Sequence, residues 1–102
     1  MTTKHYTPEQ FVESATLEYD IYWLEADGSD VIVTVTEGTD RKRYGLRGSM
    51  DGSITVQGDG RGSAFRHDSG NGHAIRRGGD GNAFRHGSGI GSAIRGDEEK
   101  VT

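Results

Sequence analysis

A short pattern that recurs through the second half of the chain restricts the fold more than any other feature of the sequence. A large apolar residue, in most copies preceded by Ala and followed by Arg, returns at a nearly constant spacing. The apolar residues of the successive copies are Val56, Phe65, Ile75, Phe84 and Ile94. Alternate copies are the most alike, since Phe65 matches Phe84 and Ile75 matches Ile94, so the full period spans two copies.

Glycine-rich segments separate these copies, such as Gly-Asp-Gly-Arg-Gly at residues 58–62. Glycine adopts positive φ angles without a steric penalty and therefore suits tight turns. Short strands of fixed period that are joined by glycine turns are typical of a β-solenoid. We expect residues 51–96 to form a β-solenoid or β-roll with two strands and about 19 residues per coil. A disordered glycine-rich tail is the alternative, because glycine and charge are abundant there and apolar residues are few.

The repeat also predicts what each face of the solenoid carries. Side chains alternate between the two faces of a strand, so the large apolar residue lies on one face and the Ala and Arg on the other. We expect the apolar residues to point inward and the arginines outward, where they form a basic ladder with two histidines. This ladder comprises Arg66, Arg76, Arg85, Arg95, His67 and His86. Because the core is thin and the sheet ends are open, we also expect a homodimer or a homotrimer.

The first half of the chain, residues 1–50, has the pattern of a separate α+β unit. Thr7-Pro8-Glu9-Gln10 has the residues of a capping box, with Pro at the first helical position, which predicts a short helix of about ten residues. Period-two alternation then predicts strands over residues 17–24, 31–36 and 41–46. We expect an antiparallel β-meander backed by the helix, hence a mainly β fold overall, and a charged tail over residues 97–102.

Charge is divided sharply between the two halves. Residues 9–37 carry eight acidic residues and no Lys or Arg, whereas residues 61–95 carry six Arg against two Asp. A chain polarised in this way attracts charged partners to one face or the other. The acidic residues that we expect to contact a partner are Glu18, Asp20, Glu25, Asp27 and Asp30.

Two resemblances bear on the repeat. Residues 78–86, Gly-Gly-Asp-Gly-Asn-Ala-Phe-Arg-His, resemble the calcium-binding nonapeptide repeats of RTX toxins. Ala83 stands where that family has a ligand Asp, and Arg85 stands at its apolar position, so the resemblance implies a β-roll without the calcium site. Segments such as Gly-Asn-Gly-His-Ala-Ile-Arg at residues 70–76 are also similar to repeats in small proteins encoded by bacteriophages. This second resemblance implies a small phage accessory protein and not a housekeeping enzyme, and it implies no activity.

The remaining motifs predict no reactive centre. The chain has no cysteine, which excludes thiol catalysis and zinc–thiolate sites and suits the reducing cytoplasm. The glycine clusters match neither G-x-G-x-x-G nor G-x-x-x-x-G-K-[ST], so no nucleotide cofactor is expected. No carboxylate accompanies the histidines at matching register, so we expect no metal. We expect neither a membrane span nor an enzyme, because no long apolar run and no paired nucleophile and base are present.

Three functions remain open from the sequence. The first is a small protein-interaction module, a phage accessory protein that inhibits or modulates a host protein of defence or nucleic-acid handling, with the acidic residues as its contact face. The second is nucleic-acid binding through the basic ladder. The third is a structural role as an oligomeric β-solenoid segment of a virion fibre.

Overall fold

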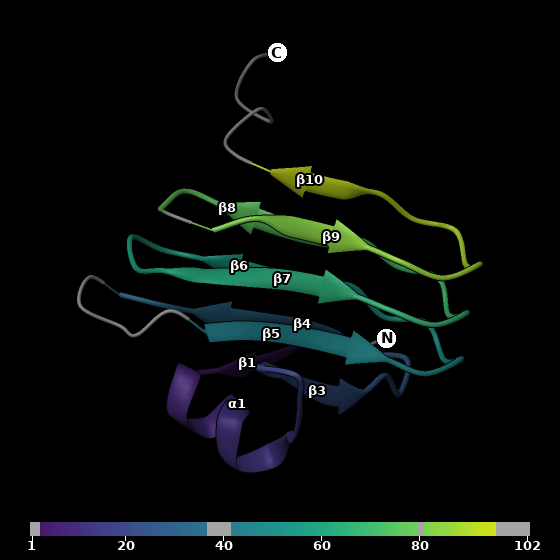
Figure 1. Ribbon diagram of the computed structural model, residues 1–102, viewed down its shortest axis with the longest axis horizontal. Helices are drawn as coiled ribbons and strands as arrows, with labels where there is room; N and C mark the ends of the chain where they lie inside the picture. Colours follow the sequence, from purple (N-terminus) through teal and green to yellow (C-terminus); the bar gives the residue numbers. More distant parts are fainter. Residues whose placement is uncertain (1–2, 37–41, 80, 96–102) are drawn as a thin grey trace.

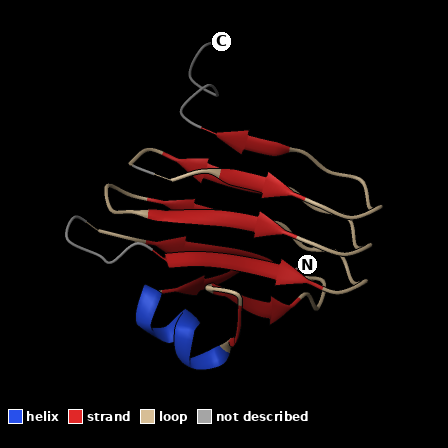
Figure 2. Ribbon diagram, in the orientation of Figure 1, coloured by secondary structure: helices blue, strands red, loops and turns tan. Residues whose placement is uncertain are grey.

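The computed structural model describes residues 3–36, 42–79 and 81–95, and the expected tail of residues 97–102 lies outside them. Within this part of the chain, two five-stranded sheets face each other and one short helix, α1 (Pro8–Ser14), lies at one end (Figures 1 and 2). The back sheet contains, in spatial order, β1 (Thr3–Tyr6), β4 (Asp30–Thr34), β6 (Ile54–Gln57), β8 (Ala74–Arg77) and β10 (Ala93–Arg95). The front sheet contains β2 (Thr16–Glu18), β3 (Ile21–Glu25), β5 (Lys42–Arg47), β7 (Gly62–Arg66) and β9 (Ala83–Arg85).

From β3 onward the chain alternates between the two sheets and forms a β-solenoid. Each strand pairs in parallel with the strand of the same sheet in the previous coil. Leu46 of β5 is thereby the register partner of Arg66 in β7, and Ala64 of β7 is the partner of Ala83 in β9. The prediction of a mainly β fold with a short helix and a solenoid of about 19 residues per coil is confirmed. Because β4 pairs with β6 and β5 with β7, both sheets continue without a break past residue 50.

The antiparallel meander expected in the first half is wrong. β3 pairs in parallel with β5, and β4, which lies between them in the sequence, belongs to the back sheet. The turn after β3 therefore carries the chain across to the other sheet. Period-two alternation determines which face of a strand is buried but does not determine its neighbour, so a meander and a solenoid share the same pattern.

The alternating stretch over residues 17–24 is a hairpin and not one strand. β2 and β3 are antiparallel, with Glu18 opposite Ile21 and only Tyr19 and Asp20 between them. Both turn residues have positive φ angles, 57° for Tyr19 and 69° for Asp20, as a type I′ turn requires. Asp tolerates this left-handed region, whereas a bulky tyrosine adopts it at a steric cost.

Replacing this tyrosine should stabilise the fold. Asn adopts the left-handed region more readily, and Tyr19 is 84% exposed, so that little packing is lost on substitution. We expect Tyr19→Asn to raise the free energy of unfolding by about 1 kcal/mol, measured by urea denaturation. A lower stability would show instead that contacts of the tyrosine ring outweigh the backbone strain.

The helix begins as the sequence predicts. The hydroxyl of Thr7 accepts the Gln10 N–H and the Gln10 side chain accepts the Thr7 N–H, each over 3.1 Å, which completes the capping box. Phe11 is fully buried, and its ring packs edge to face against Tyr6 and Tyr44. In Figure 1, α1 thereby covers the N-terminal end of the stack, where the first strands of a solenoid otherwise expose their interior.

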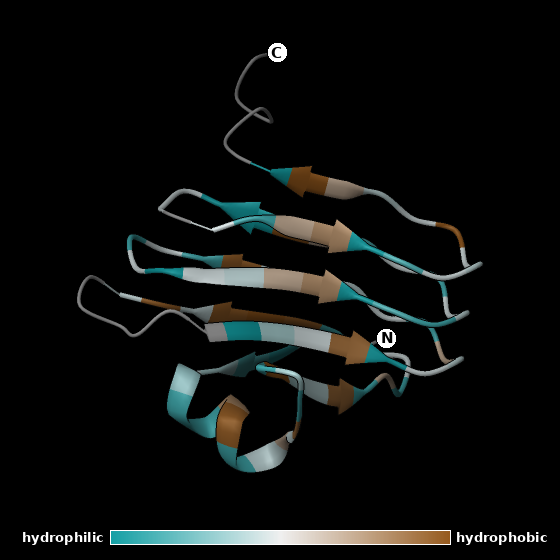
Figure 3. Ribbon diagram, viewed as in Figure 1, coloured by the Kyte–Doolittle hydropathy of each residue, from teal (hydrophilic) through white to brown (hydrophobic). Residues whose placement is uncertain are grey.

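The interior of the solenoid changes character along the stack. In the first coils it consists of large apolar side chains, namely Val31, Val33, Tyr44, Leu46, Ile54 and Val56. In the repeat, the same interior columns continue as small and basic residues, because Ala74 pairs with Ile54 and Arg76 with Val56. In Figure 3, the apolar residues lie mainly in the strands and α1, and the loops carry mostly polar or neutral residues.

The expected orientation of the repeat is therefore wrong. Val56 is buried as predicted, but Arg66 and Arg76 have no exposed surface, and the aromatic residue between Ala64 and Arg66 faces outward. Moving the register of a strand by one residue exchanges its two faces. The repeat pattern matched Val56 with Ile75, whereas in the back sheet Val56 pairs with Arg76 and Ile75 pairs with Thr55.

Candidate functional site

The four arginines of the predicted ladder, Arg66, Arg76, Arg85 and Arg95, each extend from the C-terminal part of a strand toward the loop of the preceding coil. Arg66, the last residue of β7, reaches the loop that joins β5 to β6. Its Nε donates to the Gly52 carbonyl over 2.7 Å, and one terminal nitrogen donates to the Met50 carbonyl over 2.7 Å. Its other terminal nitrogen donates to the carbonyls of His67 (2.5 Å) and Leu46 (3.4 Å). These carbonyl oxygens take the place of the water that a guanidinium loses on burial.

Arg76 makes the same arrangement on the other side of the solenoid. Its Nε donates to the Gly62 carbonyl over 2.6 Å, and Nη2 donates to the Gly60 carbonyl over 2.7 Å. Nη1 donates to the Val56 carbonyl over 3.2 Å and to the Arg77 carbonyl over 2.7 Å. A planar fork of five N–H donors matches such a ring of carbonyls, and no other side chain offers that number.

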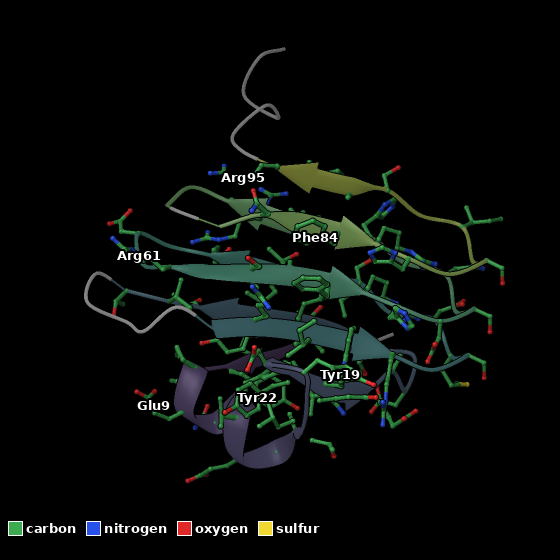
Figure 4. The ribbon with its side chains drawn as sticks, in the orientation of Figure 1. Glu9, Tyr19, Tyr22, Arg61, Phe84 and Arg95 are labelled. Atoms are coloured by element: carbon green, nitrogen blue, oxygen red, sulfur yellow. The ribbon has the colours of Figure 1, made fainter. Side chains whose placement is uncertain are left out.

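The arrangement continues toward the C-terminal end. Arg85 donates from Nε to the Gly72 carbonyl over 3.0 Å and from Nη2 to the Gly70 carbonyl over 2.6 Å. Arg95 donates to the carbonyls of Gly81 and Gly79 and is exposed, because it belongs to the last described strand of the back sheet (Figure 4). Burial of these arginines therefore decreases toward the C-terminal end of the stack.

Glycines of the arginine's own coil cover it from above. A Cβ atom at Gly70 would lie 2.2 Å from Arg66 Nη2, and one at Gly72 would lie 1.9 Å from the Gly52 carbonyl oxygen. The same close approach recurs at Gly81 over Arg76, where a Cβ atom would lie 2.8 Å from Nε. Arg66 and Arg76 are thus enclosed between carbonyls below and glycines above. The Arg and the Gly-x-Gly that follows it form one structural unit of the repeat.

These contacts show that part of the expected basic ladder is buried inside the solenoid. Loss of water lowers the pKa of the Arg66 guanidinium below its ordinary value, and the Arg85 charge lowers it further. Arg66 and Arg76 are enclosed and cannot reach a phosphate without unfolding their coils. The predicted ladder on the outer face is therefore wrong for these two residues, and the physical reason is that backbone carbonyls bind their guanidinium groups.

The outer face of the front sheet carries a row of aromatic side chains, which we call the aromatic stripe: Trp23, Phe65 and Phe84. The Phe65 and Phe84 rings stack with centroids 4.6 Å apart, and Trp23 meets Phe65 edge to face at 6.2 Å. Gly45 makes room for this packing, because a Cβ atom there would lie 2.5 Å from the Trp23 ring. Exposure rises along the stripe from 8% at Trp23 to 38% at Phe84, whose ring lies on the near face of β9 in Figure 4.

A hollow of about 470 Å³ lies beside the stripe. Its apolar lining is Phe65 and Phe84, its polar lining includes Asn82, and the cations Arg43 and Arg61 border it. Such a site can hold an apolar or planar group against the rings while the rim offers hydrogen-bond donors. Sequence reasoning did not identify this site, although the return of Phe65 as Phe84 one period later was its signal.

Two of the predicted site residues, His67 and His86, extend the stripe at one side. Their ring centroids lie 5.9 Å apart, and His67 lies 5.5 Å from Trp23. Nδ1 of His67 is 2.8 Å from the Asp68 carboxylate. Among the residues that the structure describes, no three His, Asp or Glu side chains gather into a metal-binding group.

The acidic residues expected to form one contact face are distributed over several elements. Glu18 and Glu25 lie beside Arg47, whose guanidinium is 2.5 Å from Glu18 Oε1 and 3.5 Å from Glu25 Oε2. Asp20 occupies the turn of the β2–β3 hairpin. Much of the negative charge predicted here is therefore balanced within the protein.

Asp27 and Asp30 bind groups of the protein as well. Asp27 Oδ2 is 2.5 Å from the Lys4 ammonium, which ties β1 to the loop after β3. Asp30 accepts the N–H of Ser53 over 3.1 Å and so links β4 to the loop before β6. These carboxylates help to join neighbouring coils.

The Asp27–Lys4 pair predicts a specific pH dependence. Its hydrogen bond holds the pKa of Asp27 below and the pKa of Lys4 above their ordinary values. A carboxyl group of lowered pKa stabilises the fold above its unfolded pKa, and this contribution is lost as the pH falls through the folded pKa. Asp27→Asn should therefore lower the melting temperature slightly near neutral pH and leave it unchanged at a pH acidic enough to protonate Asp27. An equal effect at both pH values would contradict this origin.

Together these features define a two-sheet parallel β-solenoid with a helical cap and an aromatic outer face. Of the described segments, none is a helix with the length and apolarity to cross a bilayer. The chain matches no family of known proteins, no curated protein and no solved structure, so its function is inferred from its own geometry.

Proposed function

We propose that this protein is a non-enzymatic protein-interaction module whose contact face is the aromatic stripe with the hollow beside it. The observation that carries this proposal is the orientation of the repeat, which places Phe65 and Phe84 outside while Arg66 lies inside. The centres of protein interfaces are enriched in aromatic residues and arginine and are surrounded by a polar rim. The stripe with Arg43 and Arg61 beside it has this composition.

The scaffold suits this function because it holds the stripe in place before a partner arrives. The rings project from hydrogen-bonded parallel strands, so little side-chain and backbone freedom remains to be lost on binding. The similarity of the repeat to phage proteins suggests a cytoplasmic host protein as the partner, which the module inhibits or modulates. A homodimer or homotrimer would present several stripes at once.

Nucleic-acid binding is the competing function, but other residues than the predicted ladder would have to carry it. The enclosed arginines no longer support it, whereas stacking of bases on Phe84 next to Arg61 would. Because phosphate contacts release counterions, such binding weakens steeply with salt, unlike an apolar protein contact.

A matched pair of variants tests the proposal. Phe84 on the front sheet and Ile94 on the back sheet belong to the last coil that the structure describes and are 38% and 37% exposed. Tagged wild-type protein, Phe84→Ser and Ile94→Ser are used to capture partners from bacterial lysate after nuclease treatment. We expect a defined protein to bind the wild type and Ile94→Ser and to be lost with Phe84→Ser, while all three proteins keep similar melting temperatures.

Other outcomes of this experiment would overturn the proposal. Equal capture by both variants would remove the stripe from the contact. Partners that disappear after nuclease treatment would favour nucleic-acid binding. A stable trimer that captures nothing would favour the virion-fibre alternative.

A further inference from the structure

The loop over residues 86–92 repeats the loops that hold arginines lower in the stack. The N–H of Gly72 donates to the Ile90 carbonyl over 2.9 Å, as the N–H of Gly52 donates to the Asn71 carbonyl over 2.9 Å. The loop 86–92 therefore stacks on the loop 67–73 as that loop stacks on the one below. Its glycines also approach the underlying arginine, because a Cβ atom at Gly89 would lie 2.5 Å from Arg85 Nη2.

This repetition identifies the acceptors of an arginine site. Gly70 and Gly72 offer their carbonyls to Arg85, and the equivalent residues one period later are Gly89 and Gly91. The repeat arginines that the structure describes are already placed elsewhere, since Arg85 enters the loop 67–73 and Arg95 donates to a loop of the other sheet. The carbonyls of Gly89 and Gly91 are thus the groups that a further guanidinium of the same repeat would use as acceptors.

The strand edge next to this site completes it. β9 is the last described strand of the front sheet, and no other described strand pairs with its outer edge. A strand edge of this kind carries N–H and C=O groups that can pair in the plane of the sheet. β9 shows how such a strand is placed. Its Arg85 enters the loop 67–73, and its Phe84 stacks on Phe65 of the neighbouring strand β7.

We propose that the C-terminal end of the solenoid binds an extended Ala-apolar-Arg segment of another protein as an added strand on β9. The guanidinium donates to the carbonyls of Gly89 and Gly91, the alanine points inward above Ala83, and the apolar side chain stacks on Phe84. Strand addition supplies the main-chain hydrogen bonds, and the arginine site supplies specificity. This inference goes beyond the stripe-mediated contact, because its acceptors lie in a loop at the end of the stack and not in the hollow.

The probe for this site is a peptide with the sequence of residues 81–87, Gly-Asn-Ala-Phe-Arg-His-Gly, acetylated and amidated. It is titrated into the full ¹⁵N-labelled chain, and amide shifts are followed by NMR. We expect shifts in β9 and in residues 86–92 and none in β2. The same peptide with Arg85→Lys should bind about tenfold more weakly, because an ammonium cannot fork between two carbonyls.

Three results of the peptide titration would overturn the proposal. These are equal affinity of the Arg and Lys peptides, shifts confined to other elements, and no binding at millimolar peptide. If the labelled chain alone shows the same shifts as its concentration rises, a second copy occupies this end, and the proposed heterologous partner is wrong.

Discussion

Arg76→Ala should destabilise the protein by about 4 kcal/mol or more, which is a large part of the stability of a domain of this size. The substitution leaves a cavity in the interior and orphans the carbonyls of Gly60, Gly62 and Val56, which otherwise accept N–H groups of Arg76. Buried carbonyls without donors cost the full desolvation penalty. Urea denaturation monitored by circular dichroism measures the change, and outright unfolding of the variant agrees with it.

The neighbouring arginine provides the control. Arg77 follows in the sequence, belongs to the same strand and has an exposed side chain. Arg77→Ala should change the free energy of unfolding by no more than about 0.5 kcal/mol. Arg76→Lys should recover only part of the loss, because one ammonium cannot reach the carbonyls of Gly60 and Gly62 with the geometry of a fork. Equal effects of Arg76→Ala and Arg77→Ala would contradict an enclosed Arg76.

Gly81→Ala should destabilise the protein by about 3 kcal/mol. The added Cβ would lie 1.8 Å from the Gly62 carbonyl oxygen and 2.8 Å from Arg76 Nε, and these two atoms are hydrogen-bonded to each other. Gly81 also has a φ of 142°, which an alanine rarely adopts. The coil must therefore open at this point to admit the methyl group.

A glycine of the same turn separates crowding from backbone strain. Gly78 has a positive φ of 69°, but a Cβ atom there would meet its nearest neighbour, the Gly58 carbonyl oxygen, at an ordinary 3.6 Å. Gly78→Ala should therefore cost only the left-handed strain of about 1 kcal/mol. Thermal unfolding of both variants provides the comparison, and equal losses would mean that the loops do not stack closely over Arg76.

The architecture of the repeat was predictable because its period is explicit in the sequence. Phe65 returns as Phe84 and Ile75 as Ile94, and glycines mark the turns, which together indicate two strands per coil. The helix was predictable for a similar local reason, since Thr7 forms its capping contacts within one turn. Both features depend on neighbours in the sequence or on exact repetition.

The sidedness of the repeat was not predictable from hydropathy. Alternation offers two assignments of the faces, and the apolar residue is the usual choice for the interior. Here backbone carbonyls stabilise the enclosed guanidinium groups of Arg66 and Arg76, and several of these carbonyls belong to the glycine-rich loops of the preceding coil. The usable signal was that Arg66, Arg76 and Arg85 are each followed by a Gly-x-Gly in the next turn, which links the arginine to the glycine loop.

The candidate site depends on this exchange of buried and exposed faces in the repeat and on the pairing of the strands. Trp23 and Phe65 meet only because β3, β5 and β7 are parallel neighbours, a pairing that the expected meander does not contain. The predicted acidic face is partly neutralised for a comparable reason. The β2–β3 hairpin, which the alternation pattern did not predict, brings Glu18 next to Arg47. Residues far apart in the chain determine both surfaces.

Hydrogen exchange at the arginine side chains tests the central claim most directly. The claim is that the repeat encloses Arg66 and Arg76 and displays its aromatic residues, whereas Arg43 is exposed on the outer face. In ¹⁵N NMR spectra at neutral pH, the Nε–H signals of Arg66 and Arg76 should exchange with water on the order of a hundredfold more slowly than that of Arg43. Equally fast exchange at all three arginines would contradict the enclosure and would mean that Arg66 and Arg76 are exposed to solvent.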